Sequence, residues 1–184
     1  MFYEMTIAGG KRQLPLRPVH DDLMIGAFVI FGDVELTCAC ARELNKLAPE
    51  YDYMVAPEAK AIPLIHEMAR QIGRNDYFLV RKTPKLYMNG VFETEVRSIT
   101  TATIQKLYMD GSDAAKLKGK RVIIIDDVIS TGESLKGVED LVERAGGEVV
   151  GRMAILAEGE AANRDDIIFL EKLPLFNGKG EPID

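Results

Sequence analysis

The feature that most constrains this chain is a run of four aliphatic residues followed directly by two aspartates and a short polar stretch. Residues 122–125 are Val-Ile-Ile-Ile, Asp126 and Asp127 follow, and residues 130–134 are Ser-Thr-Gly-Glu-Ser. A nearly continuous β-branched run is typical of a strand buried on both faces, as in a parallel sheet covered by helices. The segment therefore predicts a buried strand that delivers two carboxylates to the carboxyl edge of a parallel sheet, where open α/β folds bind ligands.

The rest of the chain alternates short strand patterns with helical patterns, which predicts an α/β fold with a parallel sheet flanked by helices. Residues 82–98 have no clear period and are expected to form a long loop, of the kind that is functional or mobile. Strands are expected at residues 53–56, 77–81, 121–125 and 149–156, and helices at residues 35–47, 62–72 and 133–144.

Three segments follow from this pattern. Residues 1–30 contain glycines and prolines that break them into short extended pieces, and we expect a small N-terminal subdomain there. Residues 31–170 are expected to form the α/β core. Residues 171–184 hold Pro174, Gly178, Gly180 and Pro182 and are expected to pack as a coil tail.

Composition excludes several classes of protein. The net charge of −6 and the pI near 5.1 argue against a protein that coats nucleic acid, which needs a surplus of Lys and Arg. The longest apolar stretches are far shorter than the roughly 20 residues that span a bilayer, and no signal peptide is expected. Cys38 and Cys40 point to different faces of an expected helix, so no metal site is predicted there. A reduced, cytoplasmic protein is expected.

The polar stretch after the two aspartates indicates a phosphate site. Backbone N–H groups at the start of a helix, together with the hydroxyls of Ser130, Thr131 and Ser134, can form a cup for a phosphate. Carboxylates beside such a cup can accept hydrogen bonds from sugar hydroxyls, so the pattern suits a sugar phosphate. The alternative is that the aspartates only cap the helix and the hydroxyl residues only form a turn.

This string resembles the phosphoribosyl-pyrophosphate (PRPP) motif of type I phosphoribosyltransferases. In that family the two acids hold the ribose 2′- and 3′-hydroxyls, and the following loop holds the 5′-phosphate. The resemblance implies a phosphoribosyltransferase-like core with a small N-terminal hood. It also implies that PRPP is bound by Asp126, Asp127, Val128, Ile129, Ser130, Thr131, Gly132, Glu133 and Ser134.

Two further segments resemble adenine phosphoribosyltransferases, in the order that the family keeps. Residues 58–61 are similar to its Glu-x-Arg-Gly stretch, with Lys60 for Arg and Ala61 for Gly. Residues 81–86 are similar to its Arg-Lys-x-Gly-Lys-Leu stretch, with Pro84 for Gly. Taken alone, this second cluster could be a solvated basic turn. The resemblance implies that pyrophosphate is bound by Glu58, Ala59, Lys60, Ala61, Arg81, Lys82 and Lys85.

The resemblance implies Mg²⁺-dependent transfer of phosphoribosyl from PRPP to a purine base, with adenine favoured. Mg²⁺ would be carried by PRPP, near Asp126 and Asp127, and closure of residues 82–100 would exclude water. Adenine enzymes of the family carry a glutamate in the mobile loop that exchanges a proton with the purine base. The matching position here is near Arg97 or Ser98, and the nearest acids are Glu93 and Glu95. The expected catalytic residues are Asp126, Asp127, Arg81, Lys85 and Glu95.

Base choice and activity leave alternatives open. Hypoxanthine-guanine enzymes of the family carry an Asp where this sequence has Ser130, which favours an adenine-type or a xanthine-type enzyme. The missing loop glutamate, Ala61 and Pro84 also fit a PRPP-sensing regulator that has lost the transfer reaction. His66 is expected to have a core or surface role, and His20 could contact the base. The resemblance implies a homodimer. The charge and the short apolar stretches predict no nucleic-acid or membrane partner.

Overall fold

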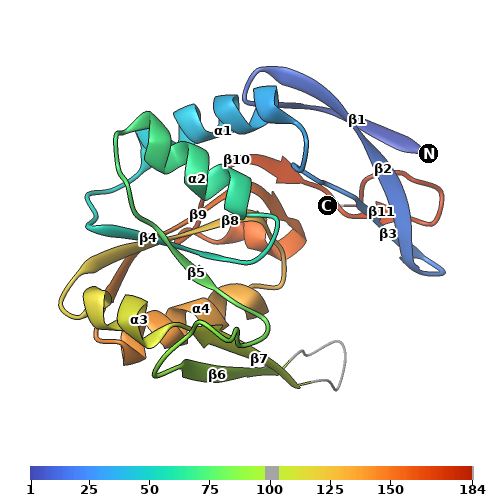
Figure 1. Ribbon diagram of the computed structural model, residues 1–184. Coiled ribbons are helices and arrows are strands. Elements are labelled where there is room, and N and C mark those ends of the chain that lie inside the picture. The colour runs from blue at the N-terminus through green and yellow to red at the C-terminus, as the bar shows by residue number, and fades with distance from the viewer. Residues whose placement is uncertain (98–103, 184) are drawn as a thin grey trace.

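The structure is a computed structural model that describes residues 1–97 and 104–183. Its centre is a five-stranded parallel sheet in the order β10-β9-β8-β4-β5 (Figure 1). The predicted α/β core is therefore confirmed. Its strands are β4 (Tyr53–Pro57), β5 (Phe78–Val80), β8 (Arg121–Ile129), β9 (Glu148–Glu158) and β10 (Ile168–Leu173).

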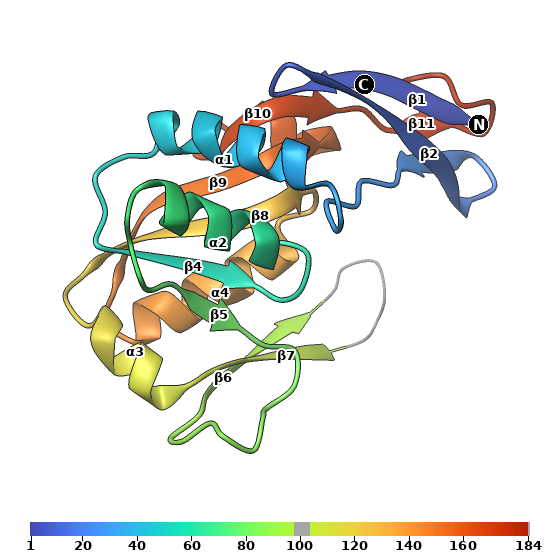
Figure 2. The same ribbon diagram turned by 45° about the horizontal axis from the view of Figure 1, so that its top comes forward.

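Helices cover both faces of the sheet (Figure 2). On one face lie α1 (Val34–Leu47) and α2 (Ile62–Gln71), and on the other lie α3 (Gly111–Leu117) and α4 (Glu133–Arg144). In β8, Ile123 and Ile125 belong to the core cluster under α1 and α2, whereas Val122 and Ile124 belong to the cluster under α3 and α4. Both faces of β8 are thus buried, which explains why its sequence is almost continuously β-branched.

The helices begin where the local chemistry favours it. The Asp33 carboxylate caps α1 by accepting the Leu36 backbone N–H at 3.1 Å. Pro63 lies in the first turn of α2, where its missing N–H costs no hydrogen bond. Gly132 precedes α4 with φ +79°, a left-handed conformation that glycine adopts without a steric penalty. Helix α3 was not predicted from the sequence.

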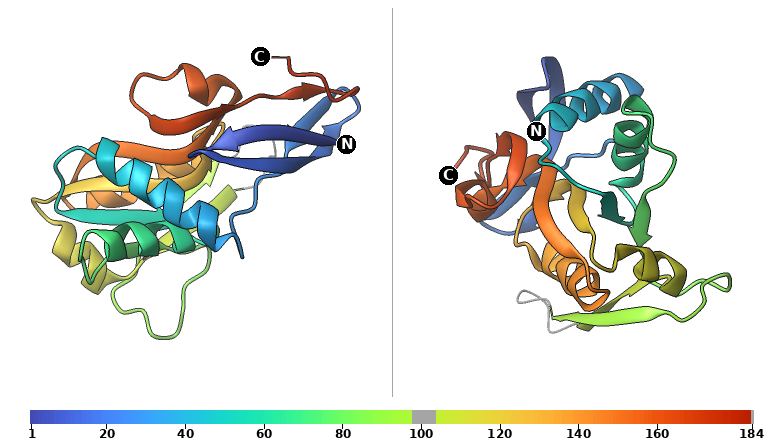
Figure 3. Two further views of the ribbon diagram at one scale, coloured as in Figure 1. Left: turned by 90° about the horizontal axis from the view of Figure 1, so that it is seen from above. Right: turned by 90° about the vertical axis from the view of Figure 1, so that its left-hand side faces the viewer.

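A second, antiparallel sheet forms the hood and takes a strand from each end of the chain. Its order is β1-β2-β3-β11, with β1 (Phe2–Ile7), β2 (Gly10–His20), β3 (Leu23–Gly26) and β11 (Phe176–Asn177). The N- and C-terminal ends marked in Figure 3 both lie beside this sheet. The expectation of a coil tail at residues 171–184 was wrong in part. Strand β10 runs to Leu173, and the fully buried Phe176 pairs with Met24.

Residues 92–97 and 104–109 form two paired strands, so part of the structureless loop that was expected at residues 82–98 is a strand. Strand β6 (Phe92–Arg97) pairs in antiparallel register with β7 (Ile104–Met109). Phe92 and Val96 pack against the core cluster under α4, so their face of the hairpin is partly buried. The part of the expected loop from Ser98 to Thr100 lies outside the described residues.

The strand that carries the two aspartates is longer than the predicted 121–125. Its pairing with β4 ends at Val55 and Ile124, whereas its pairing with β9 continues to Ile129 and Ala157. The sheet order also reverses between β4 and β8, because the chain proceeds from β4 to β5 on one side and from β8 to β9 on the other. Ligands of open α/β sheets bind at the carboxyl ends of strands at such a switch point.

Candidate active site

Asp127 and Lys60 meet across this switch point. The Lys60 ammonium nitrogen lies 2.8 Å from Asp127 Oδ2, and the aspartate side chain is only 5% exposed. Lys60 comes from the loop between β4 and α2, and Asp127 comes from the part of β8 that has no β4 neighbour. A buried carboxylate needs a compensating charge, and here Lys60 supplies it. Two segments that the sequence predicted to share one site are therefore in direct contact.

Asp126 lies next to this pair in a less favourable environment. Burial and the neighbouring Asp127 carboxylate raise the pKa of Asp126 above its ordinary value of 3.8. Two effects oppose this change: Asp126 Oδ1 accepts the Asp127 backbone N–H at 2.8 Å, and the positive charge of Lys60 favours the ionised form. Two adjacent acids with one lysine counter-ion can accept hydrogen bonds from sugar hydroxyls or coordinate a metal ion.

We expect Asp126→Asn to raise stability at neutral pH. A raised pKa means that the folded protein holds a proton that the unfolded chain releases, so the free energy of unfolding falls as pH rises from about 4 through the raised pKa. Asparagine keeps the oxygen that accepts the Asp127 N–H but cannot ionise. The free energy of unfolding at pH 7 is therefore expected to rise.

Urea unfolding between pH 4 and pH 8 checks this expectation. Asp140→Asn is the matched control, because that carboxylate is about half exposed on α4. The Asp126→Asn curve should lose the decline that the wild type and the control share. Parallel curves for all three proteins would contradict the assignment of a raised pKa to Asp126.

The loop between β8 and α4 encloses a small cavity of about 70 Å³. The cavity is of a size for a single phosphate group, and it opens beside the first turn of a 12-residue helix, whose N–H groups favour anions. Asp126 lines the same cavity, which therefore adjoins the carboxylate pair. Its other lining residues are Val128, Ile129, Ser130, Thr131, Gly132, Glu133, Ser134 and Leu135.

Glu58 joins the two segments that were predicted to bind pyrophosphate. Its Oε2 lies 2.9 Å from Arg81 Nε, and its Oε1 accepts the Lys82 backbone N–H at 2.6 Å. The Glu58 backbone N–H also donates to the Val80 carbonyl at 2.8 Å. Both charged side chains are largely buried. Glu58 thus connects the ends of β4 and β5, and it leaves Lys60 directed toward Asp127.

The structure does not bring every predicted residue into contact with this cluster. The Lys85 ammonium donates to the Thr83 hydroxyl at 3.0 Å, in the exposed part of the loop that follows β5. Glu95 lies on β6, half exposed and 3.7 Å from Lys106. Ala59 is exposed and Ala61 is buried. The roles of these four residues in binding or catalysis remain predictions.

One residue of the site region escaped the sequence analysis altogether. Arg164 Nη1 lies 2.8 Å from the position that a Cβ atom on Gly132 would occupy. No sequence signal links these two residues, because 31 positions separate them and Arg164 belongs to no motif. Arg12 has a structural role outside this region. In the structure it fixes the hood to α1, with its Nε 2.5 Å from Asp33 Oδ2.

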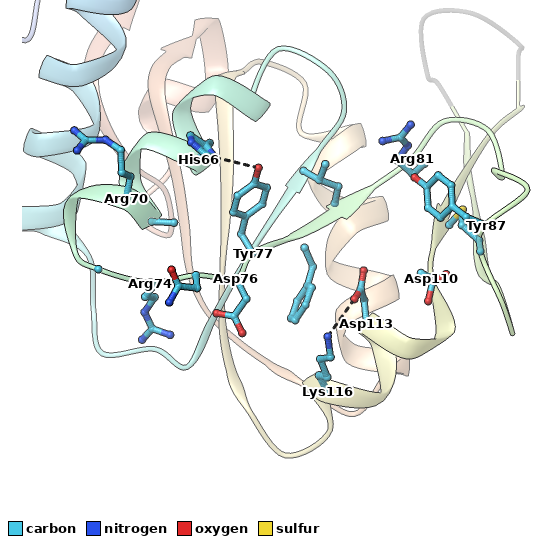
Figure 4. Close-up of a pocket in the computed structure, with 16 residues that line it drawn as sticks. His66, Arg70, Arg74, Asp76, Tyr77, Arg81, Tyr87, Asp110, Asp113 and Lys116 are labelled. Atoms are coloured by element: carbon cyan, nitrogen blue, oxygen red, sulfur yellow. Dashed lines mark hydrogen bonds and ion pairs between the residues drawn. The ribbon is translucent and has the colours of Figure 1, made fainter.

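A larger groove of about 740 Å³ runs along β5, the free edge of the sheet (Figure 4). It shares Arg81 with the cluster described above and extends past Tyr77 to the C-terminal end of α2. His66, which was expected to have a core or surface role, lines this groove, with its Nδ1 3.4 Å from the Tyr77 hydroxyl. The groove thus starts at the candidate site and leads away from it.

Within residues 1–97 and 104–183, no three His, Cys, Asp or Glu side chains gather in an arrangement that would hold a metal ion. In that part of the chain, every helix is too short or too polar to cross a bilayer.

Comparisons with known proteins agree with this geometry. The model of the phosphoribosyl transferase domain matches residues 39–178. The adenine phosphoribosyltransferase of Thermosipho africanus is 34% identical over 128 residues, which are 70% of each chain. The hypoxanthine/guanine phosphoribosyltransferase of Methanococcus voltae is 26% identical over 86% of this chain and 78% of its own.

The fold is also shared with solved structures. The crystal structure of adenine phosphoribosyltransferase from Thermoanaerobacter pseudethanolicus superposes with a TM-score of 0.65 at 24% identity, over 78% of this chain and 84% of its own. This likeness concerns the fold, whereas the match to the domain model concerns the sequence. That match covers most of the chain, including β4, β8, α4 and both aspartates. The chain therefore belongs to the phosphoribosyl transferase domain family.

Proposed function

We propose that this protein transfers the phosphoribosyl group of PRPP to a purine base. The bond between C1′ and the pyrophosphate oxygen breaks, a bond between C1′ and a ring nitrogen of the base forms, and pyrophosphate leaves. Family membership supports this reaction, as do relatives that are named adenine and hypoxanthine/guanine phosphoribosyltransferases. The observation that carries the proposal is the Lys60–Asp127 pair at the switch point, beside a phosphate-sized cavity.

Each part of PRPP has a matching group in this arrangement. The cavity in the β8–α4 loop suits the 5′-phosphate, and Asp126 and Asp127 suit the ribose hydroxyls. Lys60 and Arg81 supply positive charge for the departing pyrophosphate. Catalysis on this view consists of positioning and of stabilising the charge that develops as the bond to pyrophosphate breaks.

We propose adenine as the preferred base. The similarity to the Thermosipho africanus enzyme supports adenine, and Ser130 replaces the aspartate that the hypoxanthine-guanine branch carries. Because the Methanococcus voltae relative is named a hypoxanthine/guanine enzyme, these two bases must also be tested. A xanthine-type enzyme is the alternative within the family. Glu95 remains the candidate for proton exchange with the base, after a movement of the β6–β7 hairpin.

We also propose that Mg²⁺ takes part, bound mainly by PRPP oxygens. Carboxylate oxygens are the protein ligands that Mg²⁺ prefers, and Asp126 and Asp127 provide them beside the proposed ribose site. When bound, the metal would neutralise charge on the departing pyrophosphate. The protein's own contribution at this point is the carboxylate pair and the Lys60 ammonium that balances it.

The test is pyrophosphate release from PRPP and Mg²⁺, measured with adenine, guanine, hypoxanthine, xanthine, uracil and orotate, beside a titration of PRPP binding. Release that depends on adenine is the expected result. Release that depends only on another base would correct the substrate and keep the reaction. PRPP binding without release by any base would favour the PRPP-sensing regulator instead. Absence of PRPP binding would overturn both readings.

We propose that the protein forms a homodimer through the groove along β5. In the loop beside that groove, Leu86 is fully exposed and Tyr87 is 66% exposed, which favours a protein partner over water. Sedimentation velocity should show a dimer, and Leu86→Lys should shift it toward monomer. Leu47→Lys, at a half-exposed position on α1, is the control and should leave the dimer intact. A monomeric wild type would contradict the proposal.

We further propose a cytoplasmic location. Cys38 and Cys40 carry free thiols, which a reducing compartment preserves. Fractionation of cells that produce the tagged protein tests this assignment, and recovery outside the cytoplasmic fraction would contradict it.

A further inference from the structure

The loop between β8 and α4 stands between two cavities. Its inner side faces the cavity of about 70 Å³ that adjoins Asp126. Its other side faces a cavity of about 260 Å³ that Lys136, Glu139 and Arg164 line. Residues 131–133 line both cavities. A side chain that lines the second cavity can therefore support the backbone that also lines the first.

Arg164 provides that support. Its Nη1 lies 2.8 Å from the place where a Cβ on Gly132 would stand, and outside Gly132 and its two chain neighbours it is the one heavy atom of residues 1–97 and 104–183 within 4 Å of that place. The guanidinium occupies the space that the missing side chain leaves open. Gly132 holds φ +79° at the position before α4, and the residues of the first helical turn, whose N–H groups have no partner within the helix, line the smaller cavity.

Arg164 is itself held in place. Asp166 accepts from Arg164 Nε at 2.9 Å and from Nη2 at 2.7 Å, which is the bidentate arrangement that fixes a guanidinium plane. Nη1 is thereby turned away from Asp166, and it has no hydrogen-bond partner within residues 1–97 and 104–183. Asp166 also lies 3.6 Å from Arg152, which pairs with Glu139 of α4. The support is thus tied to β9 and to the helix that the loop begins.

We propose that Arg164 is a positioning residue for the 5′-phosphate site, and that Asp166 acts by fixing Arg164. The inference rests on the proposed function, because it takes the β8–α4 loop as the site of the 5′-phosphate. It adds a residue from the connection between β9 and β10, which lies outside the three segments that resemble family motifs.

The experiment compares ligands that carry the 5′-phosphate with one that does not. Calorimetric titrations with PRPP, ribose 5-phosphate and magnesium pyrophosphate would be run on the wild type, Arg164→Ala and Asp166→Asn. Arg42→Ala is the control, an exposed arginine on α1. Both Arg164→Ala and Asp166→Asn should weaken the binding of PRPP and of ribose 5-phosphate about tenfold. This factor corresponds to the loss of one charged hydrogen bond. Pyrophosphate affinity should stay unchanged.

Asp166→Asn separates positioning from simple attraction. Removing a negative charge near a phosphate site should tighten phosphate binding when only charge matters. Weaker binding is expected when Asp166 acts by holding the Arg164 guanidinium. The double variant should then be no weaker than Arg164→Ala alone, because the two changes remove one support. Thermal unfolding of each variant verifies that the proteins remain folded.

The possible failures are distinguishable. Unchanged ribose 5-phosphate affinity in Arg164→Ala, or tighter binding in Asp166→Asn, would overturn the role of Arg164 and leave the transferase proposal intact. Equal losses for pyrophosphate and ribose 5-phosphate would also overturn it, because the effect would then be general. A wild type that binds neither PRPP nor ribose 5-phosphate would overturn the proposed function and this inference together.

Discussion

Replacement of Asp127 by asparagine is expected to lower the turnover of PRPP by about 100-fold. The Asp127 side chain is almost wholly buried and 2.8 Å from the Lys60 ammonium, so its charge is both protected from solvent and balanced. Asparagine keeps the shape but removes a charged acceptor for a ribose hydroxyl and leaves Lys60 without its counter-ion. The loss of a charged hydrogen bond to the ribose and of the ion pair with Lys60, each worth roughly 1.5 kcal/mol, gives this factor.

Steady-state kinetics with PRPP as the varied substrate measure the effect. Asp140→Asn on α4 removes a carboxylate of the same type away from the site and should retain wild-type rates. The Asp127 variant should also show weaker binding of PRPP in a direct titration. Near-normal PRPP affinity together with normal turnover would exclude Asp127 from the ribose site.

Lys60→Met is the second large change, with an expected loss of roughly 30-fold in kcat/KM for PRPP. Two effects combine in this variant. The departing pyrophosphate loses a cation, and Asp126 and Asp127 lose the positive charge that offsets their mutual repulsion. About 2 kcal/mol is a reasonable sum for a lysine that is nearly half exposed, and it corresponds to this factor.

Lys60→Arg is the informative companion, because adenine phosphoribosyltransferases carry Arg at the matching position. It should recover most of the activity that the methionine variant loses. Lys46→Met, on the exposed side of α1, is the control. In a double-mutant cycle, Lys60→Met and Asp127→Asn should be strongly non-additive, because each removes the other's partner. Additive losses would show that the ion pair does not act as a unit.

The strands and helices that bear the motifs could be predicted because local patterns determined them. The β-branched residues 122–125 pack alternately into the two core clusters, and Pro63 and Gly146 mark the start of one helix and the end of another. The meeting of residues 58–61 with Asp127 was also predictable, since parallel strands end at one sheet edge. These features depend on residues close together in the sequence or on a general rule of the fold.

The missed features depend on distant contacts. Phe92, Thr94 and Val96 alternate with charged residues, so β6 had a period-two signal, but it lies in a stretch whose lysines, prolines and glycines indicated a loop. Strand β11 has two residues, too few for any periodicity, and it exists because β3 offers a pairing edge. The proposed role of Arg164 arises because the fold brings it next to Gly132, and the sequence around Arg164 gives no sign of this contact.

The hood has a consequence for engineering. Because β11 completes the sheet that β1, β2 and β3 begin, the hood is assembled from two stretches separated by the whole catalytic core. Phe176 is fully buried against it, and a Cβ on Gly26 would come within 3.1 Å of Leu173 and 3.6 Å of Phe176. A chimaera that exchanges hoods between relatives must therefore carry both stretches as one matched cassette. If β1, β2 and β3 alone were exchanged, Phe176 of β11 would face a sheet edge whose side chains it does not fit.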